Sequence, residues 1–166
     1  GHETTATTLT WAFYCLANAP WIEAKMLEEI ERVCPGRSPT IEDVEKLEWC
    51  KAVVQEALRL YPPVPLLPRQ AREADEIGGV KVKGGDLIMI APWLMHRATD
   101  LWEKPTHFLP ERFMGNAKIN PYVYFPFAVG PRICPGMNFG LFEATLCLAI
   151  LIRRFRVKPR AGSAGK

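Results

Sequence analysis

Apolar residues recur at helical spacing in four stretches of the chain, and each stretch predicts an amphipathic helix. In the first stretch Leu9, Ala12, Phe13 and Leu16 stand at i, i+3, i+4 and i+7, which predicts a helix ending at about residue 17. Proline-containing segments separate the stretches, because proline interrupts a helix and restricts the residue before it. The other three helices are expected at about residues 20–33, 49–61 and 137–154.

A shorter helix is predicted by its start signal. The stretch Thr40-Ile41-Glu42-Asp43 resembles a capping box, in which the side chains of the first and last residues each accept a hydrogen bond from the other's backbone N–H. We therefore expect a short helix to begin directly after Thr40.

Residues 72–92 change to a pattern typical of strands. Val80 and Val82 alternate with lysines, Leu87–Ile90 is a short apolar run, and glycine pairs mark the turns. Residues 100–136 carry many prolines, aromatics and glycines without a period, so we expect a long, ordered and functional irregular segment. A short strand is expected after the last helix. The predicted fold class is mainly α with a minor antiparallel β-sheet.

Composition and charge narrow the classes of function. Of 166 residues, 48% are hydrophobic and 23% are charged, which is typical of a globular domain with a real core. The net charge is only +3 and is spread along the chain, so it gives no case for nucleic acid as a partner. The five cysteines form no C-x-x-C pair, and this odd, irregular set favours a reducing compartment, cytoplasmic or cytosol-facing.

The start of the chain bears on its completeness. It opens at Gly1 without a methionine, already inside a helical pattern and without a capping residue. No signal peptide is visible, and no apolar run is long enough to cross a bilayer. We expect a piece of a larger protein, truncated at both ends, and a membrane anchor in a missing N-terminal part stays compatible with this sequence.

Cys134, in the stretch FAVGPRICPGMNFG, is the cysteine whose neighbours suggest chemistry. A thiolate persists near neutral pH where positive potential and hydrogen-bond donors surround it. Arg132 supplies a cation, and the helix expected from residue 137 turns its free N–H groups toward the sulfur. Gly130 and Gly136 leave the backbone bare on both sides, as a large flat ligand requires.

The alternative for Cys134 is a buried, small apolar filler in a Gly-Pro turn. This alternative does not explain why the two glycines, the arginine and the start of a helix all lie beside this cysteine. The remaining cysteines lie in helical patterns or at helix ends and are assigned to the filler class: Cys15, Cys34, Cys50 and Cys147.

The fixed positions of this loop resemble the haem-binding signature of the cytochrome P450 superfamily, F-x-x-G-x-R-x-C-x-G. All five positions match, at Phe127, Gly130, Arg132, Cys134 and Gly136, which makes the signal far more specific than a lone cysteine. The resemblance implies haem b as the cofactor, with the Cys134 thiolate as the ligand of its iron. The other four residues then belong to the cofactor-binding loop.

Two further positions bear on the haem propionates. By the resemblance, Arg69 in PLLPRQ aligns with a residue that binds a propionate, and Arg132 makes the second such contact. His96, in MHRATDLW, is a further candidate for a propionate contact, but packing or a surface hydrogen bond is the favoured interpretation. His2 and His107 are interpreted as ordinary histidines.

Glu56 and Arg59, in EALR, stand at i and i+3 on the helix expected at 49–61. Taken alone, they would be a surface ion pair of little energetic weight. Only Lys51, Gln55 and Arg59 form a polar arc on this helix, however, so a carboxylate at position 56 needs a charged partner. The pair resembles the family's E-x-x-R, and the P-E-R-F stretch implies that Arg112 completes a structural, non-catalytic cluster beneath the haem.

The opening Gly-His-Glu-Thr-Thr resembles the family's distal-helix motif. Glutamate and threonine are common on helices, and threonine often bonds back to its own helix, so the motif is informative only in order with the others. The resemblance implies that Glu3 and Thr4 relay protons to bound oxygen and that Gly1 leaves room for it.

The resemblance spans residues 1 to about 157 and implies the C-terminal portion of the cytochrome P450 fold. It implies a haem-thiolate monooxygenase that inserts one oxygen atom from O2 into a small lipophilic substrate. Electrons would come from NAD(P)H through a ferredoxin or a flavin reductase. Substrate contacts are expected near residues 5–8 and 64–67, and the isolated piece is expected to be inactive.

Other functions stay open at this point. One is a haem-binding remnant without turnover, and another is a helical domain that is not an enzyme. Retained haem without turnover would indicate the former, and failure of the folded chain to bind haem would indicate the latter. Within the family, a haem-thiolate isomerase or peroxygenase is a third possibility, against which the Glu3-Thr4 pair favours dioxygen activation.

Overall fold

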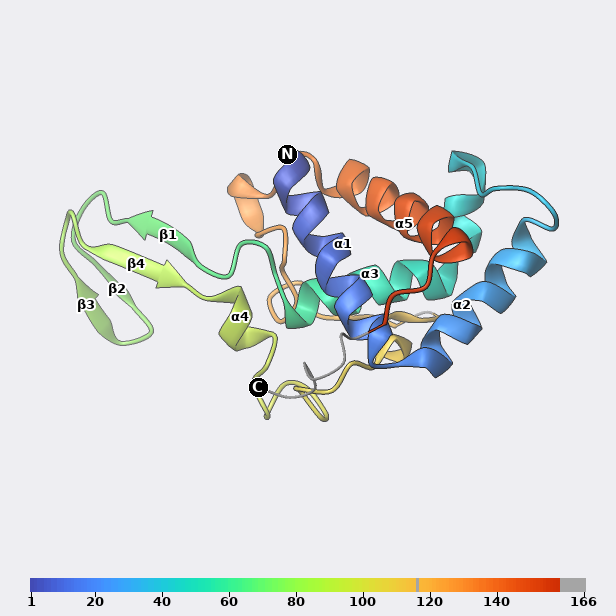
Figure 1. Cartoon of the computed structure of the whole chain (residues 1–166). Helices are drawn as coiled ribbons and strands as arrows, with labels where there is room; N and C mark the ends of the chain where they lie inside the picture. Colours follow the sequence, from blue (N-terminus) through green and yellow to red (C-terminus); the bar gives the residue numbers. More distant parts are fainter. Residues whose placement is uncertain (116, 159–166) are drawn as a thin grey trace.

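The computed structural model describes residues 1–115 and 117–158. Helices dominate the described residues and the strands are short and antiparallel, which confirms the predicted fold class (Figure 1). The α-helices are α1 (His2–Ala17), α2 (Pro20–Val33), α3 (Glu48–Leu60), α4 (Pro92–Met95) and α5 (Met137–Arg154). The 3-10 helices are η1 (Ile41–Lys46), η2 (Pro110–Phe113) and η3 (Gly130–Arg132).

Helix α3 is the centre of the helical body. It contacts α1, α2 and α5, and every residue from 52 to 60 except Gln55 is buried. The apolar stripes that predict the helices pack together here, so that hydrophobic burial holds the four long helices in one body (Figure 1). The fully buried apolar residues of this hydrophobic core include Ala12, Met26, Val53, Val54 and Leu148.

The strands form an arm beside this body (Figure 1). β1 (Leu67–Gln70) pairs antiparallel with β4 (Leu87–Ile90), and β2 (Asp75–Ile77) pairs with β3 (Val80–Val82). Two two-stranded sheets therefore stand where one small sheet is expected. The first strand begins before the predicted segment. The sequence does not predict it, because it contains Pro68 and proline disfavours a strand. In a two-stranded sheet every strand is an edge strand, where proline is tolerated.

The structure differs from the sequence prediction in two other places. Helix α4 is too short to show a hydrophobic period, and the sequence does not predict it. The strand expected after α5 is absent: residues 155–158 pair with no strand among the described residues. Within the described part of the chain, no helix is long and apolar enough to cross a membrane.

The capping box at Thr40 begins η1. The Thr40 N–H donates to Asp43 Oδ2 at 2.8 Å, and both carboxylate oxygens of Asp43 also accept from Arg37, at 2.6 and 2.8 Å. The hydrogen bonds from the Arg37 guanidinium hold the pKa of the Asp43 carboxyl well below its usual range. The segment between α2 and α3 is therefore fixed by side chains rather than by a long helix.

Helix α3 receives its N-terminal cap from a different helix. Glu29, on α2, is only 3% exposed, and its two carboxylate oxygens accept from Trp49 N at 2.9 Å and from Cys50 N at 3.2 Å. Burial raises the pKa of this carboxyl. The preceding Leu47 has no side chain that could cap, so Glu29 satisfies two otherwise free N–H groups at the start of α3.

We expect Glu29→Ala to lower the free energy of unfolding by about 2 kcal/mol, because two N–H groups lose their acceptor, one of them buried and the other partly buried. Urea titration followed by circular dichroism measures this difference. The matched control is Glu28→Ala, which removes an exposed carboxylate 3.9 Å from Lys25 and should change stability by less than about 0.5 kcal/mol. Equal losses in the two variants would contradict the capping role.

Candidate functional site

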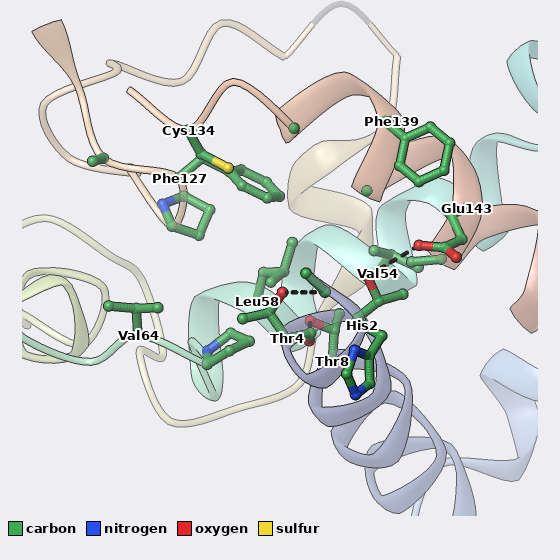
Figure 2. A pocket seen from close by; sticks show the side chains of 18 of the residues that line it. His2, Thr4, Thr8, Val54, Leu58, Val64, Phe127, Cys134, Phe139 and Glu143 are labelled. Carbon is green, nitrogen blue, oxygen red and sulfur yellow. Dashed lines mark hydrogen bonds between the residues drawn. The ribbon is translucent and has the colours of Figure 1, made fainter. Parts of the chain in front are cut away.

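A pocket of about 520 Å³ lies between the first turns of α1 and the loop that carries Cys134 (Figure 2). Most of the lining side chains are apolar, and they come from α1, α3, the segment after α3, the cysteine loop and α5. Figure 2 shows Cys134 and Phe127 on one side of the pocket and the residues of α1 on the other. The pocket therefore has one wall that carries a thiol and one wall that carries hydroxyl groups.

The cysteine loop is held by its own backbone. The Cys134 N–H donates to the Phe127 carbonyl at 2.9 Å, and Ile133 N donates to the Gly130 carbonyl at 3.0 Å. Gly130 adopts φ +73°, a conformation that costs other residues energy, which explains a glycine at this position. Helix α5 begins directly after the loop with Gly136 as its N-cap, so its free N–H groups lie beside the cysteine.

Cys134 is the one exposed cysteine among the described residues. Burial raises the pKa of the Cys15 thiol to about 12, and it also raises the pKa of Cys34, Cys50 and Cys147. These four thiols lie in or against the helical core and are inert in that setting. The interpretation of Cys134 as a buried filler does not hold, because its side chain opens to the pocket.

The residues of the pocket fit a planar, apolar cofactor. Gly136 lies beside the sulfur, where an added Cβ would sit 3.9 Å from Cys134 Sγ, and Gly1 and Gly140 line the pocket without side chains. Arg132 adds a guanidinium for an anionic rim. In a haem-thiolate protein, one cysteine thiolate is the ligand that the protein gives to the haem iron. A single cysteine in the pocket therefore fits this cofactor.

The predicted site residues do not all reach the pocket. Thr4, Phe127, Arg132, Cys134 and Gly136 line it, as does Gly1. Glu3, Arg69 and Gly130 are outside the lining set. Arg69 lies half-buried in β1, where its Nη1 donates to the neighbouring Pro68 carbonyl at 2.8 Å.

The threonine hydroxyl groups of α1 that line the pocket already have partners. Thr4 Oγ1 donates to the Gly1 carbonyl at 2.9 Å, and Thr8 Oγ1 donates to the Thr4 carbonyl at 2.8 Å, so both threonines bond back to their own helix. Thr5 differs, because its Oγ1 donates to Glu143 Oε2 on α5 at 3.1 Å. Glu143 is not among the site residues that the sequence predicts, because no local pattern indicates a contact between residues 138 positions apart.

Helix α3 also carries a fully buried ion pair. Arg59 Nε donates to Glu56 Oε2 at 2.7 Å and Arg59 Nη2 to Glu56 Oε1 at 2.8 Å, and both side chains are 0% exposed. Arg112 Nε lies 3.4 Å from Glu56 Oε1, which brings the three residues of the predicted cluster together. A buried pair of this kind is stable only when its remaining hydrogen-bonding groups are satisfied.

Backbone groups of the irregular segment satisfy this pair. Arg59 Nη1 donates to the carbonyls of His96 and Pro105 at 2.6 and 2.7 Å, and Nη2 donates to the His107 carbonyl at 3.0 Å. In return Leu109 N donates to Glu56 Oε1 at 2.9 Å. The cluster therefore ties the segment at 96–109 to α3.

His96 makes a second tie, to the residues that lead into the cysteine loop. Its ring is 0% exposed, and Nε2 accepts a hydrogen bond from Phe125 N at 3.0 Å. Next to it, the Tyr124 hydroxyl donates to the Gln55 carbonyl at 2.9 Å. The favoured interpretation of His96 as a packing residue agrees with this position, since the ring is not among the residues that line the pocket.

The described residues form a helical body with an apolar pocket, and one exposed cysteine on a loop lines that pocket. A family model described as Cytochrome P450 matches residues 1–165. The chain is 41% identical to Cytochrome P450 3A29 of Sus scrofa over 162 residues, which are 96% of this chain and 32% of that protein. It is 40% identical to Carotene epsilon-monooxygenase, chloroplastic, of Arabidopsis thaliana, over 95% of this chain and 30% of that protein.

A further relative is Protein LUTEIN DEFICIENT 5, chloroplastic, also of Arabidopsis thaliana, which is 40% identical over 98% of this chain and 28% of its own length. The chain therefore belongs to the cytochrome P450 family. It spans about a third of the length of the curated relatives that it matches.

We expect the stability of the fold to fall at acidic pH because of His96. Burial lowers the pKa of His96 from its ordinary 6.5 to about 4. Because the unfolded chain binds this proton more readily, stability is lost as the pH falls through the window from about 6.5 to about 4. The loss from this one group is on the order of 3 kcal/mol.

Urea titrations at several pH values between 7 and 4 measure this slope. The variant His96→Gln places an amide oxygen where Nε2 accepts from Phe125 N but does not titrate, so the slope should become shallower. His2→Gln removes an exposed histidine and should leave the slope as it is. Identical slopes in the His96→Gln variant and the unsubstituted chain would contradict the assignment.

Proposed function

We propose that this chain is the haem-binding, C-terminal part of a monooxygenase that transfers one oxygen atom from O2 to a small lipophilic substrate. The observation that carries the proposal is the exposed thiol of Cys134, which faces α1 across an apolar pocket within a complete F-x-x-G-x-R-x-C-x-G stretch. The printed name of one relative, a monooxygenase, supports the same reaction class.

Each residue of the loop has a physical role in this proposal. Cys134 ligates the iron as a thiolate, and the free N–H groups of α5 and the charge of Arg132 stabilise its negative charge. Phe127 supplies apolar wall, and Gly130 and Gly136 give the backbone the shape that lets a flat ring approach it. Arg132 and Arg69 contact the propionates, for which the Arg69 side chain must leave the Pro68 carbonyl.

In this proposal, the opposite wall of the pocket binds the substrate and transfers protons. Haem supplies the oxygen-activating chemistry when bound, and the protein contributes a dry, shaped pocket and a proton path. Thr4 is a hydroxyl on the pocket wall, and Glu3 is the acid beside it in the chain. Leu58, Val64 and Leu67 line the same pocket and give the apolar surface that a lipophilic substrate requires.

Electron supply and compartment follow from the same proposal. Oxygen activation by haem requires electrons, which we assign to NAD(P)H through a ferredoxin or a flavin reductase that docks near the cysteine loop. The five described cysteines are free thiols, which supports a reducing, cytoplasmic or cytosol-facing compartment.

The experiment is a carbon monoxide difference spectrum of the reduced chain after it has been supplied with haem. We expect a strongly red-shifted band, because a thiolate ligand changes the electronic structure of the iron. Cys134→Ser should move the band to the ordinary haem position. The matched control is Cys147→Ser, which removes a half-buried thiol on α5 and should retain the shifted band.

Two outcomes would contradict the proposal. A red-shifted band that persists in Cys134→Ser would assign the ligand to another residue. A folded chain that takes up no haem would favour the helical domain without enzyme activity. A red-shifted band together with no substrate oxidation in a reconstituted system would restrict the proposal to haem binding.

A further inference from the structure

The segment 62–66, between α3 and β1, forms part of the pocket wall. Pro63 and Val64 line the pocket, and Figure 2 shows Val64 at its edge. Three of the five residues are prolines, which have no N–H group to donate. Among the described residues, one hydrogen bond between backbone groups reaches this segment, from Trp93 N to the Pro65 carbonyl at 3.4 Å. Backbone bonding alone therefore holds this part of the wall weakly.

Two aromatic rings adjoin this segment, and the Arg97 guanidinium lies against both of them. Trp93 is on α4, which Figure 1 shows between the strands and the helical body, and Tyr61 directly follows α3. The Cζ atom of Arg97 is 4.5 Å from the centroid of the Trp93 ring and 5.4 Å from that of Tyr61. Trp93 is also the residue that bonds Pro65, and Tyr61 precedes the segment in the chain. Arg97 therefore joins the two side chains that bound the segment.

The Tyr61 ring is also held by α1. It stacks on the Trp11 ring, with the centroids 4.0 Å apart and the planes 6° from parallel. Tyr14, three positions further along α1, meets the Trp11 and Tyr61 rings edge-on at centroid distances of 5.5 and 6.2 Å. Aromatic rings attract one another in both arrangements. The start of the segment is therefore anchored on α1, and Arg97 connects this anchor to α4.

The charge of Arg97 has no acidic partner among the described residues. Its side chain is half-buried and forms no ion pair, and Nη1 is buried without a hydrogen-bond acceptor. Burial lowers the pKa of this guanidinium from its usual value, but an arginine side chain stays charged at neutral pH. The faces of tryptophan and tyrosine rings attract a cation, and they do so more strongly where water is excluded. The two rings therefore stabilise the charge in place of a carboxylate.

We propose that Arg97 is a positioning residue, which holds the segment 62–66 through the rings of Tyr61 and Trp93 and so fixes Val64 in the wall of the substrate pocket. The proposal rests on the function proposed above, because it concerns what that pocket accepts. Arg97 is not among the residues that line the pocket, so it acts on an occupant only through the segment. Displacement of Val64 changes the fit of a bulky occupant and leaves that of a small one as it is.

Four variants separate the charge of Arg97 from its volume. Arg97→Gln keeps part of the side chain without the charge, and Arg97→Lys keeps a cation that can lie against a ring. Trp93→Leu removes one ring and leaves the backbone N–H that bonds Pro65. The matched control is Arg72→Gln, which removes an exposed arginine that forms no ion pair among the described residues.

The first measurement follows the position of Val64 through its methyl signals in carbon–proton NMR spectra of the reduced, haem-loaded chain under carbon monoxide. We expect these signals to move in Arg97→Gln and in Trp93→Leu, because each variant removes one side of the contact. They should keep their place in Arg97→Lys and in Arg72→Gln. The methyl signals of Val80, which is exposed on β3, are the internal reference and should not move.

The second measurement compares a bulky probe with a small one in the ferric, haem-loaded chain. Imidazole and 4-phenylimidazole both bind haem iron through a ring nitrogen, and the second carries an additional apolar ring. We expect Arg97→Gln and Trp93→Leu each to raise the Kd of 4-phenylimidazole relative to that of imidazole at least about five-fold, with no further change in the double variant. Arg97→Lys and Arg72→Gln should leave this ratio within about two-fold. Absorption titrations give both constants.

The proposal is overturned if the Val64 signals of Arg97→Gln coincide with those of the unsubstituted chain. It is also overturned if Arg97→Gln and Trp93→Leu leave the ratio of the two Kd values unchanged, since a lower free energy of unfolding alone would assign Arg97 to the stability of the fold.

The carbon monoxide difference spectrum separates these outcomes from a failure of the proposed function. A red-shifted band in the unsubstituted chain, together with an unchanged ratio in the variants, refutes the positioning role alone. If the unsubstituted chain shows no such band, the haem-thiolate function is refuted. In that case the Val64 signals of the haem-free chain still decide whether Arg97 holds the segment.

Discussion

The guanidinium of Arg59 lies in the centre of the molecule with all five of its N–H groups bonded. Two go to Glu56, and three go to the carbonyls of His96, Pro105 and His107. Moving a charged group out of water costs several kcal/mol. This cost is offset only when every N–H group of the guanidinium has a hydrogen-bond acceptor. The long irregular segment keeps one conformation because its backbone carbonyls supply that pairing.

The cysteine loop depends on this cluster through a short series of contacts. His96 offers its carbonyl to Arg59 and its ring to Phe125 N, and the Phe127 carbonyl accepts from Cys134 N. The facing wall depends on α3 in a different way, through apolar packing of α1 around Ala12. One helix therefore positions both walls of the pocket, one by polar bonds and the other by hydrophobic burial.

Local patterns in the sequence predict local structure well here. The helical period places α3 within one residue of its observed ends, and the capping signal at Thr40 locates η1. The strand β1 is not predicted from the sequence, because it contains a proline, which has a low strand propensity. The structure accommodates this proline because β1 is an edge strand. The sequence puts Arg59 on a polar arc of its helix, whereas the side chain is 0% exposed, since the carbonyls that accept from it lie 37–48 positions away.

The same distinction applies to the site. The signature around Cys134 is contiguous, so a resemblance finds it, while the pair of Thr5 and Glu143 joins the two ends of the described chain and leaves no local signal.

Hydrogen exchange in the Arg59→Lys variant, with Lys51→Arg as the control, tests most directly whether the cluster holds the cysteine loop. A lysine keeps the charge beside Glu56 but cannot reach the three carbonyls. We expect the amides of Phe125 and Cys134 to exchange at least about ten-fold faster in Arg59→Lys, while those of α2 do not change. Faster exchange at Leu109 alone, with Cys134 protected as before, would contradict the dependence of the loop on the cluster.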